Sequence, residues 1–124
     1  MEKGEKMETR TNLACLHNHT TDSNRDSVMS HESLVDAAIA AGYTALAKTE
    51  HGTVIGYNTF YELCKEKGIK PILGVEAYVT CDFNSNDRRH MILMAKNNDG
   101  WKAISKAVTE SNEHVTKVST LTFP

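Results

Sequence analysis

The sequence has little cysteine, and its three cysteines are scattered. Cys15, Cys64 and Cys81 are odd in number, and no two of them form a Cys-x-x-Cys pair. This spacing indicates neither a disulfide framework nor a zinc ribbon built on thiolates. A reducing, cytoplasmic setting is therefore expected.

Long apolar runs and an excess of one charge are also missing. No apolar stretch approaches the roughly 18 residues of a membrane span, and the first six residues, MEKGEK, lack the apolar core of a signal peptide. We expect no membrane partner. Fourteen Lys and Arg against sixteen Asp and Glu give a net charge of −2, which supplies no general attraction for nucleic acid. Any contact with nucleic acid must depend on a local site.

What is present is an ordinary globular composition for one domain. The chain has 124 residues, of which 40% are hydrophobic and 24% are charged. Residues 1–12 are polar, and residues 113–124 show no clear period. We therefore predict a folded core at 13–112 between two loosely held tails.

Apolar runs and helical periods alternate along this core. Apolar runs predict strands at 13–16, 43–48, 69–79 and 90–95. Apolar residues at helical spacing predict helices from Ser30, as N-cap, to Gly42, from Tyr57 to Gly68 and over 101–108. Strands separated by helices favour buried parallel pairing with right-handed crossovers, so the predicted class is α/β.

Histidines and carboxylates lie at or near the ends of these predicted strands. They are His17 and His19 after the first strand, Asp26 at the end of the following loop, His51 after the second strand, Glu76 within the third and His90 at the start of the fourth. Loops at the carboxyl ends of parallel strands meet at one end of a sheet, so these groups can converge. Imidazole nitrogens and carboxylate oxygens are ligands for divalent metals. Glu76 has apolar neighbours, and a buried carboxylate needs a positive group beside it.

Each of these residues also has a plainer interpretation. A lone histidine such as His90 is more often a hydrogen-bonded edge residue than a ligand, and a His-x-His pair also occurs by chance. We expect His31 to be an exposed residue of a first helical turn and His114 to lie in a tail, because neither follows a strand. The aromatic side chains of the helices are expected to pack on the sheet: Tyr57, Phe60, Tyr61 and Trp101.

Four blocks carry a resemblance to a known family. They read LHNHT at 16–20, ALAKTEHG at 45–52, GIKPILGVEAYV at 68–79 and HMILMAKN at 90–97. Together, in this order, they resemble the polymerase and histidinol phosphatase (PHP) domain. The resemblance is closer still to the N-terminal PHP domain of bacterial and phage DNA polymerase III alpha subunits, and it covers about residues 13–112.

The resemblance implies a distorted (β/α)7 TIM-like barrel that holds two or three divalent ions (Zn, Mn or Mg) and hydrolyses phosphoesters. It implies metal ligands at His17, His19, Asp26, His51, Glu76 and His90, of which His17, His19 and Glu76 act in catalysis through the bound metal. Glu50 stands where the polymerase branch commonly has Asp, and we expect it to orient a ligating histidine. Metal-assisted hydrolysis needs no protein nucleophile.

In the polymerase branch the implied activity is 3′–5′ exonuclease proofreading on a DNA end during DNA replication. The implied partners are DNA, the remainder of the polymerase chain and replisome subunits. The family's domain is longer, and its later part supplies another His and an Asp-x-His pair, whereas no such pair follows His90 here. We therefore expect a barrel incomplete at its C-terminal side, from a fragment of a longer alpha subunit. Whether this chain alone is an enzyme stays open.

Other functions remain as alternatives. One is a catalytically inactive PHP module or fragment that scaffolds a replicative polymerase, which the missing later ligands favour. Another is a free-standing phosphatase resembling histidinol phosphatase, which the blocks at 68–74 and 93–97 disfavour. An unrelated amidohydrolase-type barrel also begins with His-x-His, but the later blocks do not support it.

Overall fold

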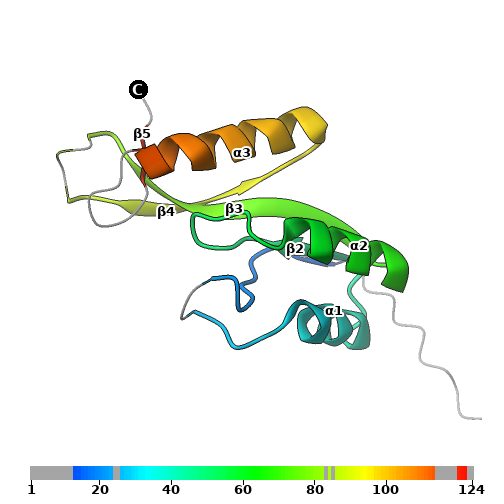
Figure 1. Cartoon of the computed structure of the whole chain (residues 1–124). Helices are drawn as coiled ribbons and strands as arrows, with labels where there is room; N and C mark the ends of the chain where they lie inside the picture. The colour runs from blue at the N-terminus through cyan, green and yellow to red at the C-terminus, as the bar shows by residue number, and fades with distance from the viewer. Residues whose placement is uncertain (1–12, 24–25, 83, 85, 114–119, 123–124) are drawn as a thin grey trace, which may run out of the picture.

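The chain folds as a small sheet flanked by helices (Figure 1). The computed structural model describes residues 13–23, 26–82, 84, 86–113 and 120–122. The elements in chain order are β1 (Ala14–Cys15), α1 (His31–Ala40), β2 (Ala45–Lys48), α2 (Tyr57–Lys67), β3 (Lys70–Thr80), β4 (Arg89–Met94), α3 (Asn98–Glu113) and β5 (Thr120–Thr122). The predicted α/β class is thus confirmed.

The sheet has the order β1-β2-β3-β4, and β5 also pairs with β3. β1, β2 and β3 are parallel, as predicted, and β5 is parallel to β3. β4 runs antiparallel to β3, with His90 opposite Tyr78. The sequence predicted parallel pairing for strands separated by helices, and no helix lies between β3 and β4. Only residues 81–88 separate these two strands, and a parallel crossover needs about a dozen residues or more.

Burial of the parallel strands also differs from the expectation at one edge. All four residues of β2 are buried, whereas in β1 Ala14 is exposed and Cys15 half-buried. β1 pairs only with β2 among the described strands. The residues of an edge strand are more exposed because no second strand, and no helix that follows such a strand, packs beside them.

Two apolar clusters hold the helices to the sheet. The first joins α1 and α2 to β2 through Leu34, Val35, Ala38, Leu46, Phe60, Cys64 and Ile69. The second joins α3 to β3 through Val75, Ala77, Val79, Ile104 and Val108. Figure 1 shows α3 along the β3–β4 pair, with α1 and α2 together on the other side of the sheet. The predicted packing holds for Tyr57 and Phe60, while Tyr61 is exposed.

Local signals set the helix ends, at the predicted positions for the start of α1 and the end of α2 and at an earlier position for the start of α3. Ser30 Oγ accepts a hydrogen bond from the Ser33 amide at 3.2 Å and caps α1. Asn97 Oδ1 accepts one from the Gly100 amide at 2.9 Å, so α3 begins at Asn98, earlier than predicted. α2 ends at Gly68, whose φ of 75° is left-handed.

The tails are only partly described. Residues 1–12 and 114–119 lie outside the described residues, so the division into a core and two tails stays a prediction. Within the predicted C-terminal tail, Thr120–Thr122 forms β5. None of the helices that the structure describes combines the length and the apolar character needed to cross a membrane.

Candidate metal centre

Three of the predicted ligands meet at one carboxylate oxygen. Oε2 of Glu76 lies 2.8 Å from Nε2 of His17 and 2.9 Å from Nε2 of His19. The two imidazole nitrogens are themselves 3.2 Å apart. His17 and His19 leave the end of β1, and Glu76 lies in β3, so strand pairing brings together groups 57 and 59 residues apart in the chain.

His51 and His90 reach the same carboxylate from two other elements. His51 forms an isolated parallel bridge with Glu76, and its Nε2 lies 3.5 Å from Oε2 of Glu76. His90 stands opposite Tyr78, and alternate residues of a strand share a face, so His90 and Glu76 point the same way. Nδ1 of His90 is 3.9 Å from Oε1 of Glu76. The antiparallel direction of β4 puts its first residues at the carboxyl end of β3, where the other histidines gather.

Asp26 joins the cluster through His51. Its Oδ2 lies 3.3 Å from Nε2 of His51, and its side chain is 43% exposed. The structure thus places all six residues in one connected cluster. The two groups whose ligand atoms lie within 4.8 Å of one another are His17, His19 and Glu76, and His51, Glu76 and His90. Asp26 belongs to neither group.

The donor atoms of this cluster fit a divalent cation. Imidazole nitrogen and carboxylate oxygen suit zinc, manganese and related ions, and no soft thiolate is needed. Three Nε2 atoms lie within 3.5 Å of one oxygen of Glu76. That oxygen has two lone pairs, so it cannot accept hydrogen bonds from all three nitrogens in good geometry. Nδ1 of His51 is buried and has no hydrogen-bond partner among the described residues. A cation would compensate this crowding of nitrogen and oxygen.

Glu76 itself is charged at neutral pH. Burial raises the pKa of its carboxyl group. The hydrogen bond from His17 and the charges of His51, His17 and His19 lower the pKa, and together they outweigh the effect of burial. The pKa therefore lies below its ordinary value. The sequence predicted a positive group beside this carboxylate, and the structure places the rings of three histidines within 3.5 Å of its Oε2.

Glu50 lies behind His19 and holds the neighbouring residue. Its Oε1 accepts from the amide of Thr20 at 2.8 Å and from the Thr20 hydroxyl at 2.6 Å. Its Oε2 is 3.9 Å from Nδ1 of His19, which is beyond hydrogen-bond distance. Glu50 therefore contacts the residue after His19 more closely than His19 itself. Its role in orienting a ligating histidine stays a prediction.

Sequence reasoning missed two residues of the cluster. The Ser23 hydroxyl is 3.1 Å from Nδ1 of His19 and accepts from the amide of His51 at 2.9 Å. The ring of Tyr78 lies 4.5 Å from that of His90 and 6.0 Å from that of His51. Tyr78 follows Glu76 by two residues in a strand, which is a usable signal for a shared face. A serine within a turn carries no such signal.

His31 is not the exposed residue that the sequence predicted. Its Nε2 lies 2.8 Å from Oδ2 of Asp22 and 3.1 Å from Nζ of Lys48, and its side chain is only 16% exposed. The expectation is wrong because the loop after β1 folds back over the first turn of α1. His114 lies outside the described residues.

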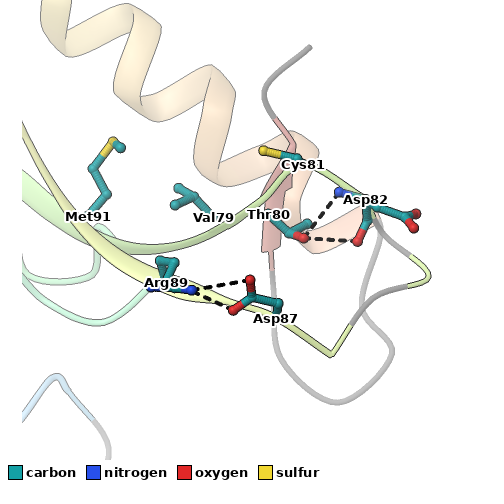
Figure 2. Close-up of a pocket in the computed structure, with 7 residues that line it drawn as sticks. All are labelled: Val79, Thr80, Cys81, Asp82, Asp87, Arg89 and Met91. Carbon is teal, nitrogen blue, oxygen red and sulfur yellow. Dashed lines mark hydrogen bonds and ion pairs between the residues drawn. The ribbon is translucent and has the colours of Figure 1, made fainter.

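A pocket of about 350 Å³ lies away from this cluster (Figure 2). It is lined by Val79, Thr80, Cys81, Asp82, Asp87, Arg89 and Met91. Figure 2 shows Arg89 paired with Asp87 at the start of β4, and the distance from Nε to Oδ1 is 3.0 Å. Val79 alternates with Tyr78, so this pocket opens on the face of β3 opposite the histidines. It contains none of the predicted site residues.

Comparison with known proteins agrees with the family resemblance. The model of the PHP domain matches residues 16–120. DNA polymerase III subunit alpha of Aquifex aeolicus is 36% identical over an alignment of 107 residues, and the match covers 76% of this chain and 9% of the relative. That of Chlamydia trachomatis is 34% identical over an alignment of 115 residues, and the match covers 83% of this chain and again 9% of the relative. The chain thus spans about a tenth of the length of these relatives.

Solved structures support the fold. A protein from Bifidobacterium adolescentis named as a metal-dependent phosphoesterase has a TM-score of 0.61 at 23% identity and covers 81% of this chain and 33% of its own. An amidohydrolase from Chromobacterium violaceum has a TM-score of 0.64 at 22% identity and covers 83% of this chain and 34% of its own. The sheet is thus part of a TIM-like barrel, as predicted. With a family match over most of its length, the chain belongs to the PHP domain family.

Proposed function

We propose that this chain is the metal-binding part of a PHP domain in a DNA polymerase III alpha-like protein, and that the domain hydrolyses phosphodiester bonds at a DNA 3′ end. The observation that carries the proposal is the convergence of four histidines on Glu76. The names of the relatives support a polymerase context, and the name of one structural neighbour supports phosphoester chemistry. The finer activity is 3′–5′ exonuclease proofreading.

The proposed ligands are the six residues of the cluster. His17, His19 and Glu76 would hold one divalent ion, and His51, Glu76 and His90 a second, with Glu76 shared. When bound, such ions polarise phosphate oxygens and lower the pKa of water. Zn, Mn and Mg are the candidate metals, and Asp26 could supply a ligand for a third ion.

The exposed side chains of two proposed ligands support access of a large substrate to this cluster. The side chains of His17 and His90 are 51% and 52% exposed, whereas that of Glu76 is 7% exposed. The buried carboxylate would fix the position of the ions, and the exposed histidines would leave one side open. A DNA end can approach from that side without opening the fold. We also propose the remainder of a polymerase chain and replisome subunits as partners, in the cytoplasm.

The test uses a DNA strand labelled at its 5′ end. With Mn²⁺ or Zn²⁺, the intact chain should shorten the strand from its 3′ end, and chelation of the metal should stop the reaction. The double variant His17→Ala/His19→Ala should lose the activity, while Glu110→Ala, which removes an exposed side chain of α3, should keep it. Metal-dependent shortening that survives the double substitution would refute the site.

A second candidate function is a catalytically inactive module that helps to position a polymerase. The observation that favours it is the apolar surface exposed beside β1, at Leu13 and Leu16, because such surface is typical of contact with another segment or chain. The same assay separates the two functions. Tight metal binding without any shortening of DNA would support the scaffold.

A further inference from the structure

Lys48 is a buried cation that the proposed metal site does not use. It is the last residue of β2, and its side chain has no exposed surface. Its Nζ lies 2.6 Å from Oδ2 of Asp22 and 3.1 Å from Oε1 of Glu50. It also lies 3.0 Å from the carbonyl oxygen of Ile55. A buried ammonium is costly unless partners of this kind surround it, so its position is closely specified.

The partners of Lys48 come from separate segments of the chain. Asp22 lies in the loop between β1 and α1, and the Thr20 hydroxyl of the same loop accepts from Nζ at 3.3 Å. His31, in the first turn of α1, lies 3.1 Å from Nζ. One ammonium therefore connects β2 to this loop and to the helix that follows it.

The same loop carries residues of the metal cluster between those that contact Lys48. Thr20 and Asp22 face the ammonium, whereas His19 and Ser23 contact each other and the cluster. Asp22 and His19 are only three residues apart in this loop, so a shift of the backbone at Asp22 would be passed on to His19. The loop cannot shift away from Lys48 without carrying His19 with it.

The backbone of Gly56 packs closely against Asp22 and His31. Gly56 has a φ of 72°, and a Cβ placed there would lie 2.2 Å from Oδ2 of Asp22 and 2.7 Å from Cε1 of His31. The absence of a side chain at Gly56 thus lets the start of α2 approach the ion pair. Lys48 and Gly56 hold Asp22 from two sides.

We propose that Lys48 is a positioning residue, which acts through Asp22 to hold the loop after β1 so that His19 stays in the metal cluster. This inference rests on the proposed function, since it assigns Lys48 a role in assembling that site. Removing one partner of a buried ion pair leaves the other charge less well compensated, which costs stability, and here it also releases the loop that carries His19. The expected effect of breaking the ion pair is therefore on the metal group that contains His19.

The experiment titrates the full chain with Co²⁺ and follows its visible absorption. We expect two binding steps, which His17→Ala and His90→Ala assign to the two groups. Asp22→Ala removes the ion pair between Asp22 and Lys48, while Glu50 stays paired with the Lys48 ammonium. It should weaken the His17–His19–Glu76 step about tenfold or more and leave the His51–Glu76–His90 step within about twofold. The matched control is Asp36→Ala, which removes an exposed ion pair with Lys67 and should change neither step.

Circular dichroism of each variant separates positioning from a loss of fold. Asp22→Asn is measured in parallel because it keeps the shape of the side chain, and it should show the same selective loss to a smaller extent. Equal weakening of both steps, or no weakening in a folded variant, would overturn the role of Lys48. A wild-type chain that binds no Co²⁺ would instead contradict the proposed metal site itself.

Discussion

At the scale of single residues, Glu76 is the common partner of the histidines in the candidate site. Its Oε2 faces the Nε2 atoms of His17, His19 and His51. Its neighbours Val75 and Ala77 point to the opposite face and pack in the cluster beneath α3. One strand thus anchors the apolar core with one face and a charged site with the other.

The charge of Glu76 should be essential for metal binding. Glu76→Gln keeps the shape of the side chain but removes the negative charge that both ligand groups share. We expect Co²⁺ affinity to fall by about tenfold or more at both steps, as measured by calorimetric titration. Glu110→Gln on α3 is the control, because Glu110 pairs only at the surface with Lys106. Unchanged affinity in Glu76→Gln would exclude Glu76 as a ligand.

Ser23 should tune the same site without contacting a metal. Its hydroxyl is hydrogen-bonded to His19 and accepts from the amide of His51, so Ser23→Ala frees both. We expect metal affinity to drop by about tenfold and the free energy of unfolding by about 1–2 kcal/mol. Ser105→Ala on α3 should alter neither quantity. If Ser23→Ala binds metal as tightly as the wild type, the hydroxyl has no orienting role.

Asp22 should make stability depend on pH. Burial raises the pKa of its carboxyl group, but hydrogen bonds from Lys48 and His31 and their charges lower it below its ordinary value of 3.8. A depressed pKa contributes stability above pH 3.8, and this contribution is lost as the pH falls through the folded-state value. Asp22→Ala should therefore be less stable than the wild type by about 1–3 kcal/mol at pH 7, and the difference should shrink near pH 3.

Urea unfolding at the two pH values measures this difference. Asp36→Ala is the control, because the Asp36 side chain is 62% exposed and its ion pair should contribute little at either pH. A difference between Asp22→Ala and the wild type that stays constant or grows on acidification would contradict the assignment.

At the scale of elements, the sequence predicted the helices better than the direction of the strands. α1 and α2 have caps and apolar residues at helical spacing, so local chemistry defines them. The apolar run of β4 predicts a strand but not whether it runs parallel to β3, because direction depends on the connection before it. β5 lacks a clear period, and its pairing with β3 is not encoded locally.

The sequence likewise predicted some residues of the candidate site and missed others. Residues at strand ends could be predicted to converge, and the structure places four histidines near Glu76 and Asp26 beside one of them, His51. The contacts of Ser23, His31 and Lys48 could not, because they depend on how the loop after β1 folds back. Such contacts between distant segments leave no periodic pattern in the sequence.

α2 should be the element whose core contact matters most. The ring of Phe60 is fully buried between α1, α2 and β2, whereas the adjacent Tyr61 is 39% exposed. Phe60→Ala should lower the free energy of unfolding by about 3–5 kcal/mol, and Tyr61→Ala by less than about 1 kcal/mol. Thermal and urea unfolding give both values. Equal losses in the two variants would mean that α2 does not pack as described.

At the scale of the whole molecule, the described sheet is an open part of a barrel. The outer edge of β1 has no strand beside it among the described elements, and Leu13 and Leu16, on either side of β1, are 61% and 44% exposed. A hollow of about 370 Å³ between β1 and α1 reaches His19. Exposed apolar residues beside an open edge are typical of a surface that another segment or chain covers.

This open edge should cause association at high concentration. The variant Leu16→Lys, which places a charge beside the edge of β1, should reduce the association. Sedimentation velocity over a range of concentrations measures it, and Lys102→Ala on α3, where the side chain is 80% exposed, is the control. A wild-type chain that stays monomeric at all concentrations would show that this edge needs no cover.

The central claim is that histidines from three parts of the chain and Glu76 form a metal site in a PHP domain. The most direct test is the metal content of the purified chain after equilibration with Zn²⁺ or Mn²⁺ and removal of loosely bound ions, measured by elemental mass spectrometry. We predict at least one tightly bound ion per chain in the wild type and a clear loss in His17→Ala/His19→Ala. Less than one ion per wild-type chain, or equal metal content in the double variant, would contradict the claim.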